Sequence, residues 1–236
     1  MAQNITKKDH TLDVLENPDV LADRLTHGSE DFVSKYKNVL LGLLGVVAAA
    51  IIGGYLFYNY RNTQEKEAQA DMFQAIYYFE ADSLNKALKG DGQYRGLTTI
   101  ADEYGSTKAG NLAKFYTGVI YLKQGKFKEA INYLGDYKSN DLILQGKAYS
   151  LLGDANLELG NKKEAIDYYL KAADYNSNEF FTPQYLMKAG AAYEANNDFA
   201  KATEVYNRII NNYANAAEVA DAKKYKARAE LLAAGK

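Results

Sequence analysis

The amino-acid sequence predicts an all-α protein, in which a single transmembrane helix precedes an α-solenoid of helical hairpins closed by a C-terminal capping helix. Residues 39–58 form an uncharged apolar run, and three later segments repeat one pattern of small and large residues. Only two prolines occur in 236 residues. Since proline interrupts both helices and sheets, while alanine favours helices, this composition favours a chain built largely of helices.

The composition also excludes several kinds of chemistry. The chain has no cysteine, which rules out thiol nucleophiles, disulfides and zinc-thiolate sites. With 28 basic and 30 acidic side chains, it lacks the basic excess of a protein that binds nucleic acid through phosphates. The two histidines, His10 and His27, are widely separated, and no catalytic or nucleotide-binding motif is present. We therefore expect no enzyme, catalytic residue, metal site or cofactor, and no nucleic-acid partner.

Residues 1–38 are expected to form an acidic, partly disordered cytoplasmic tail. This segment holds five basic and seven acidic side chains, too few apolar residues for a core, and one helix signal. Asn17-Pro18 predicts the start of a short helix, because proline suits the first helical position, and Gly28 predicts its end. The apolar side of that helix could alternatively dock a cytoplasmic partner.

Residues 39–60 are predicted to be a transmembrane anchor helix. The 20 apolar residues from Val39 to Tyr58 would span about 30 Å, the thickness of the hydrocarbon core of a bilayer. A buried core helix would need a much larger domain, and a signal peptide has a shorter apolar stretch. Three basic residues precede the run and two follow it closely, which favours a cytoplasmic N-terminus: Arg24, Lys35 and Lys37, then Arg61 and Lys66.

Small residues recur every four positions in this anchor, at Gly45, Ala49 and Gly53. They share one helix face and would permit the close approach of a second membrane helix. A homo-oligomer packed through this face is therefore a hypothesis.

Beyond the anchor, residues 61–110 are predicted to contain a juxtamembrane helix and a degenerate first repeat. The helical spacing of apolar residues predicts one helix over 61–89, ended by Gly90-Asp91-Gly92. A degenerate unit can be aligned over residues 74–110, because Leu97, Ile100 and Tyr104 match three residues of the last repeat: Tyr206, Ile209 and Tyr213.

Residues 111–214 contain three repeats that begin at Asn111, Gly146 and Pro183. Counted from these starts, position 8 is glycine and position 20 is alanine in every unit, and large residues occupy position 24. The glycines are Gly118, Gly153 and Gly190; the alanines are Ala130, Ala165 and Ala202; the large residues are Leu134, Tyr169 and Tyr206. Small residues allow two antiparallel helices to cross closely, with large ones filling the space beside them. Each unit is therefore predicted to be a helical hairpin.

Position 15 holds Gly125, Gly160 or Asn197, residue types that accept the left-handed backbone of a turn after a helix. The period and this small-and-aromatic pattern resemble tetratricopeptide repeats. Residues 215–236 are then predicted to form a capping helix, which covers the apolar face of the last hairpin.

The first helices of successive hairpins form one wall of such an array, and their positions 2, 5, 9 and 12 are predicted to face a groove that binds a peptide or a partner helix. The candidate partner-binding residues are Leu112, Phe115, Val119 and Leu122, then Lys147, Ser150, Asp154 and Leu157, then Gln184, Ala191 and Glu194, with Lys188 taken at position 6 of the third repeat. The wall is predicted to be apolar in the first of these repeats and mixed in charge in the others.

The order of tail, anchor and small repeat domain resembles the bacterial YfgM-like family, the ancillary subunit of the SecYEG translocon, whose repeat domain is related to that of cell division coordinator proteins. The resemblance implies a single-pass protein of the bacterial inner membrane with a periplasmic repeat domain. It implies the translocation channel, chaperones or exported clients as partners. A scaffold for cell-envelope assembly or division, and a cytoplasm-facing repeat adaptor, are the alternatives.

Overall fold

A computed structural model describes the backbone of residues 18–235 and the side chains of Asp19 and residues 34–235. By its internal contacts, the chain divides into two compact units, residues 1–60 and residues 61–236. All regular elements in the described residues are helices, so the predicted all-α class is confirmed. The predicted tail residues 1–17 lie outside the described part of the chain.

The long helix α2 spans Pro18–Glu80. Its residues up to Tyr60 are the described part of the first unit, and its residues from Arg61 onward belong to the second unit. The helix begins at Pro18 as predicted, but Gly28 does not end it. Glycine inside a helix costs only about 1 kcal/mol relative to alanine, which the neighbouring turns can absorb. The apolar run lies in a helical stretch, Ser34–Glu80, whose most apolar part has a mean hydropathy of 2.4 and no buried residue. This helix is long and apolar enough to cross a membrane.

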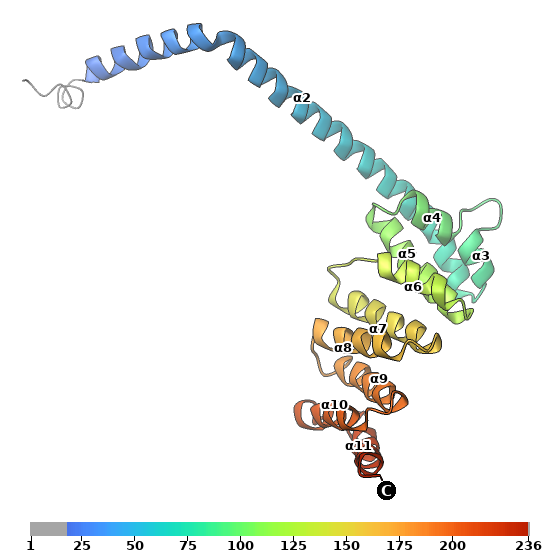
Figure 1. Cartoon of the computed structure of the whole chain (residues 1–236). Coiled ribbons are helices and arrows are strands. Elements are labelled where there is room, and N and C mark those ends of the chain that lie inside the picture. Colours follow the sequence, from blue (N-terminus) through green and yellow to red (C-terminus); the bar gives the residue numbers. More distant parts are fainter. Residues whose placement is uncertain (1–17, 236) are drawn as a thin grey trace, which may run out of the picture. The chain divides into compact units, whose positions relative to one another are not determined.

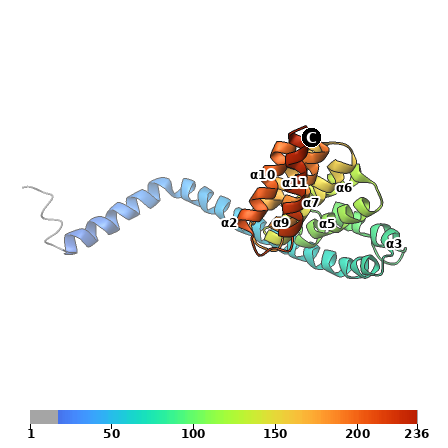
Figure 2. The same ribbon diagram turned by 90° about the horizontal axis from the view of Figure 1, so that it is seen from below.

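The second unit contains three successive helical hairpins, which stack as an α-solenoid (Figure 1). The first pairs α5 (Lys108–Lys123) with α6 (Phe127–Asp136), and the second pairs α7 (Leu142–Glu158) with α8 (Lys162–Tyr175). The third pairs α9 (Thr182–Ala195) with α10 (Phe199–Asn212), and α11 (Val219–Ala233) packs on α10. Viewed from below, α9, α10 and α11 lie side by side at the C-terminal end of the stack (Figure 2).

The predicted close crossing of small and large residues is confirmed within each hairpin. A Cβ atom added to Gly118 would lie 2.5 Å from Cγ of Leu134. The equivalent atom at Gly153 would lie 2.5 Å from Cε1 of Tyr169, and at Gly190 2.4 Å from Cε1 of Tyr206. Position 8 is therefore glycine because the side chain at position 24 lies directly against the backbone there.

The turns inside the hairpins also adopt the predicted conformation. Gly125, Gly160 and Asn197 have φ angles of 71°, 81° and 61°. Each residue follows the end of the first helix of its hairpin and reverses the chain toward the second.

The predicted helix over residues 61–89 is wrong in one respect, because α2 ends at Glu80 and a new helix, α3, covers Leu84–Lys89. Asp82 between them has a φ of 53°, so it forms the same left-handed turn as the glycines in the later repeats. A third helix, α4, covers Leu97–Glu103.

This turn places the degenerate unit differently from the alignment over residues 74–110. If the unit starts at Ala68, Ala75 and Ala87 fall at positions 8 and 20, and both are fully buried. Leu97 aligns with Tyr206, which is at position 24 of the last repeat. In the unit that starts at Ala68, position 24 is Asp91, so Leu97 comes six residues too late. The second helix of this hairpin is therefore split into α3 and α4 by an inserted loop, which contains Gly90 and Gly92.

Three clusters of buried residues form the core of the second unit. The first cluster joins the end of α2 to α3, α4 and α5, the next joins α5 and α6 to α7, and the last joins α8 to α11. The capping helix contributes Ala222 and Ala229, both fully buried, with Val219 and Tyr225 packed beside them. Leu232, in the last turn of the same helix, is 43% exposed.

Candidate protein-binding surface

The corrected first unit adds a fourth segment to the predicted wall of the solenoid. With the unit starting at Ala68, positions 2, 5, 9 and 12 hold Gln69, Met72, Ile76 and Phe79 of α2. Three of these four side chains are apolar, as are all four of the next repeat. The apolar end of the wall therefore begins on α2 and continues on α5.

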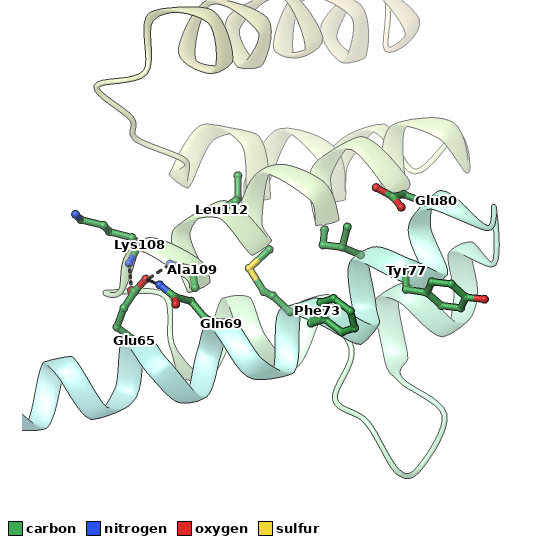
Figure 3. A pocket seen from close by; sticks show the side chains of 10 residues that line it. Glu65, Gln69, Phe73, Tyr77, Glu80, Lys108, Ala109 and Leu112 are labelled. Atoms are coloured by element: carbon green, nitrogen blue, oxygen red, sulfur yellow. Dashed lines mark hydrogen bonds between the residues drawn. The ribbon is translucent and has the colours of Figure 1, made fainter.

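A groove of about 630 Å³ lies between α2 and α5 (Figure 3). Its α2 side consists of seven residues on successive turns, and its α5 side of the first turns of that helix. The lining residues are Glu65, Gln69, Met72, Phe73, Ile76, Tyr77 and Glu80 of α2 with Lys108, Ala109 and Leu112 of α5. Phe73 is 78% exposed and Tyr77 is 60% exposed. Large aromatic side chains so exposed beside a groove are typical of an interaction site.

Hydrogen bonds and ring contacts fix the two walls of this groove. The carboxylate of Glu65 accepts hydrogen bonds from the backbone N–H groups of Lys108, at 2.6 Å, and Ala109, at 3.2 Å. It thus satisfies free donors at the start of α5, where a helix favours negative charge. Further along, the ring of Phe79 packs edge-on against Tyr116, with centroids 5.2 Å apart. The groove is therefore held by contacts at both ends.

The predicted residues of α5 lie partly in the wall and partly in the core. Leu112 lines the groove, and Val119 and Leu122 are half-buried. Phe115 is only 7% exposed, because its ring packs against Tyr137, with centroids 5.2 Å apart. Phe115 therefore presents little surface to a partner.

In the second repeat, three of the four predicted wall residues are polar. Lys147 is exposed, Leu157 is half-buried and Ser150 is fully buried. Asp154 accepts a hydrogen bond from the hydroxyl of Tyr169 at 2.7 Å and pairs with Lys188 at 2.7 Å. This ion pair joins α7 to α9 and so connects two repeats.

The charges of this cluster are already paired within the wall. Lys188 also donates to the hydroxyl of Ser150 at 3.3 Å. Burial raises the pKa of the Tyr169 phenol above its usual range, and the neighbouring Asp154 carboxylate raises it further. The phenol therefore stays protonated and continues to donate to that carboxylate.

Glu194, in the third repeat, connects the array to its cap. Its carboxylate accepts a hydrogen bond from the Tyr206 hydroxyl at 2.9 Å and pairs with Arg228 of α11. Gln184 and Ala191, on the same helix, are exposed. In this part of the wall, polar groups largely bind one another.

In the anchor, Gly45, Ala49 and Gly53 are all exposed. A Cβ atom added at Gly45 or Gly53 would meet no other atom within 4 Å. The face is accessible to a second helix.

Sequence reasoning missed the α2 side of the groove, including Phe73 and Tyr77. The signal that would have found it is the series Ala75, Asp82 and Ala87, which repeats the spacing of Gly118, Gly125 and Ala130. Position 15 is an aspartate in that series instead of glycine or asparagine, so the residue type does not indicate a left-handed turn.

Comparison with known proteins confirms the repeats. Family models described as tetratricopeptide repeat match residues 146–179, and residues 112–141 and 184–216. These ranges begin within one residue of the predicted starts. Tetratricopeptide repeats are typically non-catalytic scaffolds that bind proteins, so this chain contains a protein-interaction module.

Two similar proteins agree with this assignment. A TPR repeat-containing protein of Methanocaldococcus jannaschii is 31% identical over 96 residues, which are 41% of this chain and 16% of that protein. The chain thus matches about one sixth of the length of that relative. A crystal structure of nearly identical TPR-like repeats from a Podospora anserina kinesin light chain superposes with a TM-score of 0.55 at 13% identity. The aligned region covers 73% of this chain and 89% of the kinesin light chain structure. At this identity the similarity supports the fold alone.

Proposed function

We propose that this chain is a membrane-anchored, non-enzymatic module that binds partner proteins through the wall of its repeat array. One observation supports the membrane anchor: the side chains of the apolar run are exposed throughout, with Leu44 69% and Val46 70% exposed. Burying an apolar side chain of this size is worth about 1.5–3 kcal/mol, so the 11 valine, leucine, isoleucine and phenylalanine side chains of the run strongly favour the bilayer. The exposed aromatic residues of the α2–α5 groove support the binding role.

The partner class proposed is the protein-translocation machinery or the chaperones of the periplasm. The support is the resemblance of the layout to the YfgM-like family and the basic residues before the anchor, which favour a cytoplasmic N-terminus and a periplasmic repeat domain in the bacterial inner membrane. A scaffold for envelope assembly or division has the same features, and a cytoplasm-facing adaptor has the opposite orientation. Self-association through Gly45, Ala49 and Gly53 is part of this proposal.

Protease accessibility tests the orientation. Protease added to intact spheroplasts is expected to digest the repeat domain, and inverted membrane vesicles are expected to protect it. The reverse pattern would contradict the periplasmic location and favour the cytoplasm-facing adaptor.

Photo-crosslinking in cells tests the partner. A photoreactive residue is placed at Phe73 in the groove, at the exposed wall residues Lys147 and Gln184, and at Phe180, which is 79% exposed but outside the wall. Partner adducts are expected from the wall sites and not from Phe180. Adducts with the translocation channel or a chaperone would support the proposed partner class, whereas division or envelope proteins would favour the scaffold. Adducts from Phe180 alone would contradict binding through the wall.

A further inference from the structure

We infer that the groove between α2 and α5 binds an amphipathic α-helix of a partner protein, about four turns long. This inference rests on the proposed function and specifies the ligand of one part of the wall. It follows from the shape of the groove, its lack of backbone hydrogen-bonding groups and the charges at its two ends.

The length of the groove matches a short helix. On α2 the lining runs from Glu65 to Glu80, a rise of about 22 Å at 1.5 Å per residue. Its volume of about 630 Å³ is within the range of about 300–1,000 Å³ for ligand pockets. Residues four apart on α2, such as Phe73 and Tyr77, form ridges that the side chains of another helix can pack between.

The lining favours a helix over an extended peptide. Every lining residue belongs to α2 or α5, whose interior backbone groups are already hydrogen-bonded within the helices. An extended peptide would lay unpaired N–H and C=O groups against Met72, Ile76 and Leu112. A helix satisfies its own backbone and needs only an apolar face from its partner.

Charge at the two ends gives the bound helix a direction. Lys108 and Glu65 lie at one end of the groove and Glu80 at the other (Figure 3). The Glu65 carboxylate accepts hydrogen bonds from the backbone N–H groups that start α5, so the ammonium of Lys108 is the unpaired charge at its end. The side chains of Lys108 and Glu80 pair with no other group among residues 34–235. A helix places its partial positive charge at its N-terminus and its negative charge at its C-terminus. The partner helix is therefore oriented with its N-terminus at Glu80 and its C-terminus at Lys108.

The probe for the test is a fluorescent 14-residue designed helix with leucines at positions i, i+3, i+4 and i+7, a lysine in its first turn and a glutamate in its last. Its binding to the full chain in lipid nanodiscs is measured by anisotropy against empty nanodiscs. A scrambled peptide of the same composition, a peptide with a central proline and a peptide with the two charges exchanged are compared with it.

We expect Phe73→Glu to weaken binding about tenfold or more, because it removes an aromatic anchor. Phe180→Glu is the matched control, since both rings are almost equally exposed, and it should bind the peptide like the wild type. The wild type should prefer the original charge order by roughly two- to fivefold, since exposed charge pairs are weak, and Glu80→Lys should abolish this preference because both ends of the groove are then positive.

Equal binding of the scrambled or proline peptide, or unchanged binding to Phe73→Glu, would overturn the inference. A full chain that is dimeric, binds no peptide and becomes monomeric in Phe73→Glu would show that a second copy occupies the groove. Crosslinks in cells from Lys147 and Gln184 without any from Phe73 would leave the proposed function standing while this inference fails.

Discussion

At the scale of single residues, the glycines at position 8 determine how closely the paired helices approach. A Cβ atom at Gly153 would lie 2.5 Å from the ring of Tyr169, which is only 2% exposed and has no room to move away. Overpacking a core typically costs about 1–3 kcal/mol, which exceeds the gain of about 1 kcal/mol that alanine brings to a helix. Gly153→Ala should therefore lower the free energy of unfolding by about 1–2 kcal/mol. Urea titrations of the variant and the wild type measure this difference.

Gly135 provides the matched control for this substitution. It lies in α6, and a Cβ atom added there would meet nothing within 4 Å. Gly135→Ala should leave stability unchanged or raise it by up to about 1 kcal/mol. If both variants were equally stable, the close crossing at Gly153 would be contradicted.

Asp91, in the loop between α3 and α4, makes the stability of the first repeat depend on pH. Its pKa is lowered to about 2, chiefly by the hydroxyl of Tyr78, which donates a hydrogen bond at 2.5 Å. The backbone N–H groups of Tyr94 and Gln93 donate to it at 2.9 Å and 3.0 Å. Because the folded-state pKa is lowered, the charged carboxylate stabilises the fold above its unfolded pKa near 4. That stabilisation is lost as the pH falls from about 4 to about 2.

Asp91→Asn keeps an oxygen that accepts the two backbone hydrogen bonds but carries no charge. We expect the variant to be less stable than the wild type at pH 6 and to approach it at pH 2.5. Unfolding midpoints measured by circular dichroism at the two pH values give the comparison. A difference between variant and wild type that does not change with pH would contradict the role of the charge.

At the scale of elements, the hairpins were predictable because their determinants are local. Gly118 and Leu134, or Gly190 and Tyr206, are separated by a fixed number of residues, so their contact follows from the hairpin alone. The turn glycines likewise depend only on the residues beside them. The sequence pattern therefore predicts the three hairpins and the cap.

The first repeat and the exposure of the wall were less predictable, because they depend on tertiary packing. The insertion between Ala87 and Leu97 interrupts the period, and only the buried cluster that holds both residues shows that they belong to one hairpin. Position 5 was predicted to face the groove, yet Phe115 is covered by Tyr137, which follows the end of α6. That contact depends on how the chain leaves one hairpin for the next.

At the scale of the whole molecule, the second unit buries apolar side chains in its core, whereas the described apolar side chains of the first unit are exposed. All three buried clusters use residues from Ala68 onward, so the second unit contains its own core. The apolar run of the first unit has no buried residue in the described part of the chain. A repeat array is stabilised by contacts within and between neighbouring repeats, which all lie in the second unit.

This difference predicts how the two units behave when they are separated. Residues 61–236 expressed alone should be soluble in water, helical by circular dichroism and cooperative in urea unfolding, because the removed segment contributes nothing to the three buried clusters. The full chain should remain in the membrane fraction after alkaline carbonate extraction, since its apolar run is long enough to span the hydrocarbon core of a bilayer. Aggregation of residues 61–236 would show that the repeats depend on the first unit. Release of the full chain by carbonate would contradict the anchor, and with it the proposal that the repeats act at a membrane.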